Sequence, residues 1–361
     1  SEGMTEGTYM RVSGTTRPVE GYMLKELILE GQNRYFDSEP CGELQITDED
    51  IQNFCKTMKE TAIKNTWQNS EKAKIKDITK NTLLSWGILT EVQGEIFPTN
   101  AYALLTGQLR MQPVIQCGLF KGKDRAYFAD RKEFDGPIQN QVDAAYQYVL
   151  EKINMGMQIQ GIYRQDVYEL PTDSVRELIA NAVAHRSYLE PGNIQVAIFD
   201  DRLEVTSPGM LLNNVSIKKM MEGYSKPRNP AIANAFAYMK IIEKWGTGIP
   251  RIFRECREYG LPDPELIDFD GDFRVNMYRN TAIDYSPRVN DRVNDKVNDR
   301  VNEIEEKILK FIDNDPAITI TQLSMELELS RKTIAAKLKT LKEKKMIERV
   351  GSSRKGYWKI L

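Results

Sequence analysis

The stretch Ser174-Val-Arg-Glu-Leu-Ile-Ala-Asn-Ala-Val-Ala-His-Arg186 has the apolar spacing of one amphipathic helix. Glu177, Asn181 and His185 follow one another at intervals of four residues, so they lie on the same side of that helix. Apolar residues occupy the other side: Val175, Leu178, Ile179, Ala182 and Val183. We therefore expect this helix to pack on a sheet and to present three polar side chains on its free side.

Two short strands follow this helix. Residues 194–199 and 202–206 have strand-like patterns and are joined by a tight Asp200-Asp201 turn, which predicts a β-hairpin. Further on, Trp245-Gly-Thr-Gly-Ile249 is a glycine-rich turn that begins another helix. Together these elements predict an α/β sandwich over residues 166–280.

These residues resemble the ATP-binding fold that DNA gyrase, mismatch-repair ATPases and sensor histidine kinases share, the GHKL superfamily. A helix of that fold carries Glu-x-x-x-Asn, which Glu177 and Asn181 match. The resemblance implies that Asn181 holds Mg²⁺ against the phosphates of ATP or another nucleotide, and that Glu177 activates water as a general base. Oxygen ligands of this kind suit Mg²⁺, which keeps several waters and relies on substrate phosphates.

Further cofactor-binding residues are expected around this helix. Gly246-Thr247-Gly248 matches the loop whose bare backbone can approach phosphates at a helix start. His185 could touch a phosphate, and Lys226 and Arg228 are phosphate candidates from the Ser225–Pro230 segment. Gly209 matches the one glycine that remains of the adenine-binding box.

The departures from the superfamily are equally informative. Its Asp-x-Gly-x-Gly box, whose Asp contacts the adenine amino group, is Ser207-Pro-Gly-Met-Leu211 here and lacks the Asp and the second Gly. Its later Gly-x-Gly-x-Gly lid is shortened to Gly246-Thr-Gly-Ile-Pro250, which leaves adenine specificity and hydrolysis both open. In the alternative interpretation, Glu177 and Asn181 cap nearby loops and His185 hydrogen-bonds a neighbouring loop.

The C-terminal sixty residues have the order of a winged helix-turn-helix. Apolar spacing predicts a helix within residues 303–312, a short helix capped by Thr321 through Leu323, Met325 and Leu327, and a third helix after Ser330. That third helix places its apolar residues inward: Ile334, Leu338 and Leu341. Residues 347–350 and 357–360 then predict a β-hairpin, the wing.

Charge indicates a polyanion as the partner of this module. Ser330–Leu361 contains eleven Lys or Arg and two Glu, a local net charge of +9 in a chain whose net charge is −2. The last helix of such a module enters the DNA major groove. We therefore predict that these residues bind double-stranded DNA: Arg331, Lys332, Thr333 and Lys337 on the helix, with Arg354 and Lys355 on the wing. The alternative is a winged helix that contacts only proteins.

Between the two modules, a tetrad of one basic residue, Val, Asn and one acidic residue repeats four times from Arg288 to Glu303. Only one position in four is apolar, so residues 281–302 are expected to form a solvated linker, with a weak helix or self-association seam as the alternative.

Composition narrows the classes of function. The chain has 361 residues, 41% hydrophobic and 28% charged, which is typical of a soluble protein of two or three domains. Four scattered cysteines and a single histidine argue against a disulfide framework, a thiolate zinc site and most metalloenzymes. No apolar run is long enough to span a bilayer and no secretory signal is visible, so we expect a cytoplasmic protein with no membrane partner.

A narrower resemblance covers essentially the whole chain. It is similar to the bacterial regulators with a Schlafen/AlbA-type domain that are often labelled RecG-like, through the stretches FKGKDRAYFADRKEFDGPI, ELIANAVAHRSY, SKPRNPAIANAF, IIEKWGTGIPRI and CREYGLPDPEL. The resemblance implies that residues 1–45 are the end of the AlbA-type domain, whose start this chain lacks. Residues 46–165 are then a connector of mixed helices and strands. No Gly-x-x-x-x-Gly-Lys-[Ser/Thr] motif supports helicase activity.

The expected fold is therefore α+β and multidomain, a GHKL-like sandwich at 166–280 plus a winged helix-turn-helix at 303–361. The leading hypothesis is a homodimeric, DNA-binding transcriptional regulator whose GHKL-like domain senses a nucleotide or serves as a scaffold. There are two alternatives: a slow Mg²⁺-dependent ATPase, and a structural dimerisation protein of a defence or stress system.

Overall fold

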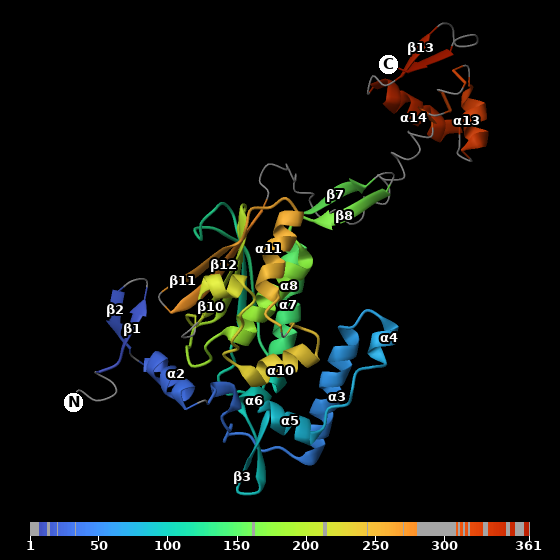
Figure 1. Ribbon diagram of the computed structural model, residues 1–361. Helices are drawn as coiled ribbons and strands as arrows, with labels where there is room; N and C mark the ends of the chain where they lie inside the picture. The colour runs from blue at the N-terminus through green and yellow to red at the C-terminus, as the bar shows by residue number, and fades with distance from the viewer. Residues whose placement is uncertain are drawn as a thin grey trace. The chain divides into compact units, whose positions relative to one another are not determined.

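The computed structural model describes residues 7–12, 15–19, 21–32, 34–160, 163–211, 215–243, 245–269, 271–279, 308–309, 311–312, 315–316, 318–327, 331–343, 347–350 and 357–360. The chain divides into two compact units, Ser1–Tyr285 and Ser286–Leu361 (Figure 1). The expected linker at 281–302 lies outside the described residues.

A six-stranded mixed sheet forms the centre of the first unit. Its order is β11-β12-β10-β9-β5-β6, and every neighbouring pair is antiparallel except β5 and β9. The strands are β5 Ile115–Phe120, β6 Phe128–Phe134, β9 Ile194–Ile198, β10 Arg202–Pro208, β11 Glu265–Phe269 and β12 Asp272–Tyr278. The predicted hairpin is present, because β9 pairs with β10.

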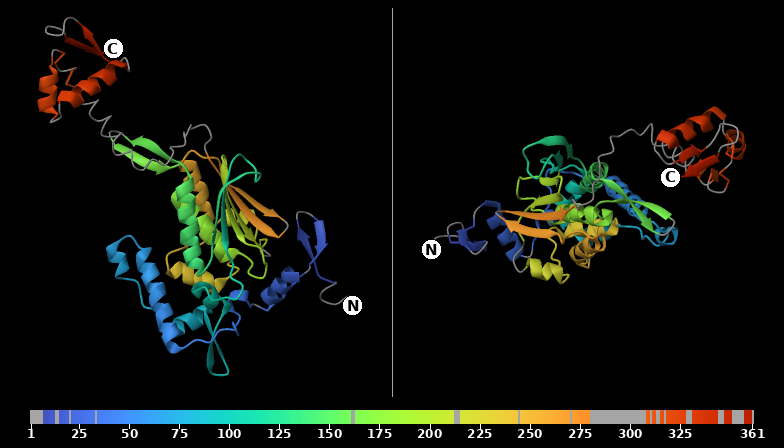
Figure 2. Two further views of the ribbon diagram at one scale, coloured as in Figure 1. Left: turned by 180° about the vertical axis from the view of Figure 1, so that it is seen from behind. Right: turned by 90° about the horizontal axis from the view of Figure 1, so that it is seen from above.

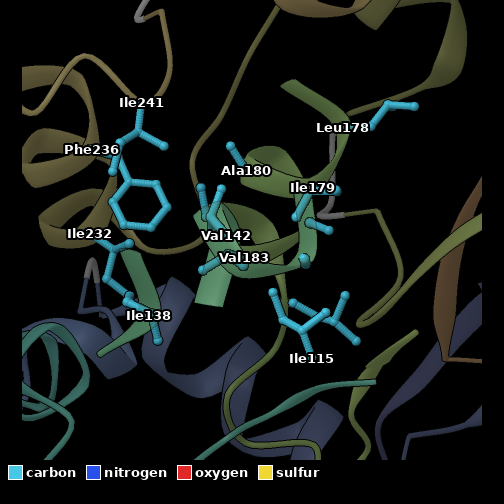
Figure 3. Packing of buried hydrophobic residues seen from close by; sticks show 14 of the residues in the cluster. Ile115, Ile138, Val142, Leu178, Ile179, Ala180, Val183, Ile232, Phe236 and Ile241 are labelled. Atoms are coloured by element: carbon cyan, nitrogen blue, oxygen red, sulfur yellow. The ribbon is translucent and has the colours of Figure 1, made fainter. Parts of the chain in front are cut away.

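Helices α7 (Ile138–Lys152) and α8 (Thr172–His185) pack on the sheet, and α11 (Gly248–Glu258) packs beside α8 (Figures 1 and 2). Strand alternation explains this arrangement. On β10, Leu203 and Val205 belong to the core that faces the helices, while the intervening Glu204 does not. Figure 3 shows the helix side of this core, where Ile179 and Val183 of α8 lie beside Val142 of α7.

The sheet crosses the domain boundary that we expected at residue 166. Strand β5 runs parallel to β9 over the pairs from Ile115↔Ile194 to Leu119↔Ile198, and β6 pairs with β5. Residues 115–134 therefore complete the sheet of the sandwich. Parallel strands need a long crossover connection, and residues 121–193, which include β6, α7 and α8, supply it here.

The remaining elements of the first unit flank this sandwich, and those within residues 48–64, 80–106 and 230–238 contribute apolar side chains to the same core. They are β1 Tyr9–Val12, β2 Thr15–Pro18, α2 Gly21–Gly31, η1 Phe36–Ser38, α3 Asp48–Lys64, α4 Asn69–Lys72, α5 Lys80–Trp86, β3 Leu89–Val92, β4 Glu95–Pro98, α6 Asn100–Thr106, β7 Met155–Gln160, β8 Tyr163–Tyr168, α9 Ile217–Met221 and α10 Pro230–Tyr238. Among the described residues, no helix has the length and apolarity that crossing a bilayer requires.

A buried carboxylate connects the N-terminal part to α10. Asp37 of η1 is fully buried, and its Oδ2 accepts hydrogen bonds from the backbone N–H groups of Ala231 (2.7 Å) and Ile232 (3.1 Å). These donors lie in the first turn of α10, where backbone N–H groups lack helical partners. Burial nevertheless dominates and raises the pKa of Asp37 from 3.8 to about 6.

This shift predicts a pH-dependent stability. Because the folded pKa lies above the unfolded one, Asp37 stabilises the fold most below its unfolded pKa, and that contribution is lost as the pH rises through about 6. We expect the free energy of unfolding of the wild type, relative to Asp37→Asn, to fall by about 3 kcal/mol between about pH 3 and about pH 7. Asn keeps an acceptor oxygen but does not titrate. Urea denaturation at several pH values measures the difference, and a difference that is constant with pH would contradict the prediction.

The second unit has its own core, built from three helical segments and a hairpin. Residues 308–309 and 311–312 are helical, followed by α13 Ile320–Glu326, α14 Arg331–Glu343, and the antiparallel pair β13 Ile347–Val350 and β14 Tyr357–Ile360. Its buried side chains are Ile308, Ile312, Ile318, Leu323, Ile334, Leu338, Leu341, Ile347 and Trp358. The order helix, helix, helix, hairpin is the predicted one.

Two details of α13 differ from the expectation. Thr319 caps the helix instead of Thr321, because Thr319 Oγ1 accepts from the Gln322 N–H while the Gln322 side chain accepts from the Thr319 N–H. Thr321 lies inside the helix, where its position cannot cap. Met325, one of the apolar residues from which this helix was predicted, is 71% exposed.

Candidate functional site

A cavity of about 320 Å³ lies beside α8, bounded by α11, strands β10 and β12, and the segment 224–230. Eight of the nine residues predicted to serve catalysis or cofactor binding line it: Glu177, Asn181, His185, Gly209, Lys226, Arg228, Gly246 and Gly248. Thr247 is absent from the lining, and its hydroxyl donates to Glu243 Oε2 at 2.7 Å. The fold thus gathers side chains from four separate segments around one space.

Glu177 lies on the buried wall of this cavity and has partners for both oxygens. Its side chain is 4% exposed; Asn181 Nδ2 donates to Oε1 at 3.1 Å, and Arg251 Nη2 donates to Oε2 at 2.9 Å. Burial raises the pKa of Glu177, and the Arg251 guanidinium opposes that rise. Each oxygen already accepts one hydrogen bond, and the Arg251 ion pair makes the carboxylate a weaker base than it would be without this partner.

The two glycines of the predicted phosphate loop have a packing role. A Cβ on Gly248 would lie 2.2 Å from Glu177 Oε1, and a Cβ on Gly246 would lie 2.0 Å from the Gly223 carbonyl oxygen. Gly246 also has a φ of +70°, which side chains rarely adopt. The glycine turn therefore lets the start of α11 close against the Glu177 carboxylate.

Arg251 connects the start of α11 to this carboxylate. It lies one turn into the helix, donates through Nη1 to Glu243 Oε1 at 2.6 Å, and has a side chain that is 22% exposed. Neither Arg251 nor Glu243 was among the residues predicted from the sequence. Their partner Glu177 is 74 residues from Arg251 in the chain, so no local pattern could reveal the pair.

Asn181 leaves its side-chain oxygen available for a metal ion, because its contact with Glu177 uses the amide nitrogen. No cluster of three His, Cys, Asp or Glu that could hold a metal occurs in the part of the chain that the structure describes. This donor set fits an Mg²⁺ ion that takes one protein oxygen and obtains its other ligands from phosphate and water.

His185 faces the same cavity in a form that carries no charge at neutral pH. Burial, with the nearby Arg228 guanidinium as a smaller cause, lowers the pKa of His185 to about 4. A neutral imidazole can exchange hydrogen bonds with a ligand but adds no positive charge for a phosphate.

Lys226 and Arg228 both have acidic partners on α2. Lys226 Nζ pairs with Glu30, and Arg228 Nη1 pairs with Glu26. Arg228 also donates through Nη2 to the Met210 carbonyl oxygen, and its side chain is only 9% exposed. Neither glutamate was among the residues predicted from the sequence.

The rest of the cavity is mainly apolar, which suits a planar or hydrophobic part of a ligand. The apolar lining residues are Leu178, Ala182, Val205, Met210, Leu211, Val215, Met220, Ile242, Ile249, Phe273 and Val275. Ser207, which occupies the Asp position of the adenine box, lines this part and donates its hydroxyl to the Ala182 carbonyl at 2.9 Å.

The predicted DNA interface lies on α14 of the second unit. Arg331 is exposed at the first residue of the helix, and Thr333 and Lys337 are half-buried. Ile334 and Leu338 of the same helix enter the core. The side chain of Lys332, and Arg354 and Lys355 altogether, lie outside the described residues.

Comparisons with known proteins agree with this architecture. Residues 192–277 match a family model described as "Putative ATP-dependent DNA helicase recG C-terminal", and residues 305–357 match a helix-turn-helix domain. The chain carries a domain similar to the first and a helix-turn-helix domain, the arrangement expected from the sequence. The first match begins after α8, so it includes Lys226, Arg228 and the glycine turn but not Glu177 or Asn181.

One solved structure extends the comparison to the whole chain. The DIP2311 protein from Corynebacterium diphtheriae is 19% identical, with a TM-score of 0.53, and the alignment covers 99% of this chain and 70% of that one. At this identity the likeness shows the fold alone. No curated protein matches the chain.

Proposed function

We propose that this chain is a DNA-binding transcriptional regulator whose first unit senses a nucleotide. The proposal rests on one observation: the same cavity is lined by Asn181, His185, Lys226, Arg228 and the glycine turn. Its apolar part suits a base, and its cationic wall suits phosphates. The helix-turn-helix domain supplies the contact to DNA.

Sensing suits this cavity better than rapid hydrolysis. Asn181 and Arg251 each donate a hydrogen bond to the Glu177 carboxylate, and both contacts weaken Glu177 as a base toward an attacking water. The Asp that would contact adenine is replaced by Ser207. We expect micromolar or weaker nucleotide binding with little turnover.

The test is a thermal-shift titration of the full chain with ATP, ADP and GTP, with and without Mg²⁺. A ligand that binds only the native state raises the melting temperature, and a concentration of 100 times Kd corresponds to about 2.7 kcal/mol. Asn181→Ala should remove the part of the shift that requires Mg²⁺, while Asn53→Ala on the exposed side of α3 should leave it intact. Rapid hydrolysis that Glu177→Gln abolishes would favour the ATPase instead.

We further propose that the regulator acts as a homodimer. Helix-turn-helix proteins commonly bind two half-sites, and their two-fold symmetry matches that of the operator. Sedimentation equilibrium of the full chain tests this directly, and a monomer at micromolar concentration with and without DNA would rule it out.

A further inference from the structure

The two cations of the cavity wall are held by one face of one helix. Glu26 and Glu30 are four residues apart on α2, so they lie on the same side of that helix. They meet Arg228 and Lys226, which are two residues apart on the segment 224–230. The Arg228–Glu26 and Lys226–Glu30 partners are 202 and 196 residues apart in the sequence, so α2 comes to the cavity wall from a distant part of the sequence.

Arg228 remains incompletely satisfied in this arrangement. Its Nη1 and Nη2 have acceptors, but its Nε is buried and has no hydrogen-bond partner among the described residues. A buried guanidinium donor without an acceptor costs free energy comparable to a lost hydrogen bond to a charged group. Arg228 lines the cavity but this nitrogen is covered, so an entering anion reaches it only when the side chain moves away from Glu26.

We propose that Lys226 and Arg228 form an anion-binding subsite for the phosphates of the nucleotide, and that α2 is its internal competitor. This inference rests on the proposed function. In the free protein, Glu26 and Glu30 neutralise both cations. A polyphosphate places several negative charges beside Lys226 and Arg228. It therefore repels Glu26 and Glu30 and competes with them for the two cations. Nucleotide binding therefore releases α2 from the segment 224–230.

This competition couples nucleotide binding in the cavity to the attachment of α2. Because α2 binds mainly the ligand-free form, the nucleotide and α2 each lower the affinity of the site for the other, as linkage requires. When the nucleotide binds, α2 and the preceding strands β1 and β2 thereby change their attachment to the rest of the first unit. The conformation of this N-terminal segment then depends on whether the cavity holds a nucleotide.

The test combines hydrogen exchange with a charge-neutral variant. In the wild-type full chain, saturating ATP should accelerate amide exchange in residues 21–31 about tenfold, as the loss of two partly buried ion pairs implies. Glu26→Gln with Glu30→Gln should show that faster exchange without ligand and should bind ATP about tenfold more tightly. Pyrophosphate alone should also accelerate amide exchange in α2 of the wild type and should also bind the double variant more tightly. Each effect should be weaker than with ATP, because pyrophosphate lacks the base.

The matched control is Glu60→Gln with Glu71→Gln. Both residues pair with a lysine at the protein surface, and the double change alters the net charge equally. Equal ATP affinity in the two double variants, or ATP binding to the wild type with no change in α2 exchange, would overturn the competition and leave the proposed function intact. Absence of binding by ATP and pyrophosphate to every variant would overturn both.

Discussion

Arg251→Met should lower the free energy of unfolding of the first unit by about 3–5 kcal/mol at neutral pH, because removing one partner of a buried ion pair leaves the other charge uncompensated. The stranded group is Glu177, whose side chain is 4% exposed. Met occupies about the same space as the aliphatic part of the Arg251 side chain. The decrease in the free energy of unfolding therefore measures mainly the loss of charge and only slightly the loss of volume. Urea denaturation followed by tryptophan fluorescence measures it.

Two controls separate the buried pair from helix effects. Arg254→Met removes an exposed arginine from the same helix, paired with Glu258 at 3.8 Å, and should cost no more than about 1 kcal/mol. Adding Glu177→Gln to Arg251→Met should restore much of the lost stability, since an amide needs no countercharge. Equal losses for Arg251→Met and Arg254→Met would contradict this account of the site.

The sign of the pH effect follows from the Glu177 carboxyl. Burial already raises its pKa in the wild type, and removing Arg251 takes away the main opposing influence. A folded pKa further above the unfolded value makes the protein less stable as pH rises. The deficit of Arg251→Met should therefore be smaller in mild acid than at neutral pH.

Raising the salt concentration from 50 to 200 mM should weaken DNA binding by the full chain about 100-fold, if about four phosphates are neutralised at about 0.9 log units of slope each. Arg354→Ala with Lys355→Ala, predicted from the sequence as wing contacts, should weaken specific and random duplexes alike. It should also reduce the slope by about 1.8. Fluorescence anisotropy over a salt series measures both quantities.

Residues on the recognition helix should behave differently. Arg331 is exposed at the start of α14, where side chains reach base edges, so Arg331→Ala should cost about 1–3 kcal/mol on the specific site and less on random DNA. Lys332→Ala is predicted from the sequence to act in the same way. Lys56→Ala, an exposed lysine of α3, is the control. No binding to any duplex at low salt would favour the protein-contact alternative for this domain.

The second unit was largely predictable from the sequence. Its helices and hairpin follow from local apolar spacing, and Ile334, Leu338 and Leu341 are buried as that spacing predicts. The cap of α13 was misassigned by two residues because the deciding partner was Gln322, three residues after Thr319. Such errors concern element ends, which depend on single hydrogen bonds.

In the first unit the sequence determined α8, the hairpin of β9 with β10 and the shared face of Glu177, Asn181 and His185, because helix and strand periodicity is local. Only the tertiary structure decided which strands pair and which charges meet. The parallel pairing of β5 with β9 extended the sheet past the expected boundary, and Arg251 joined Glu177. The physical reason is the same in each case: pairings between residues tens to hundreds of positions apart depend on how separate apolar faces bury one another, which no local pattern contains.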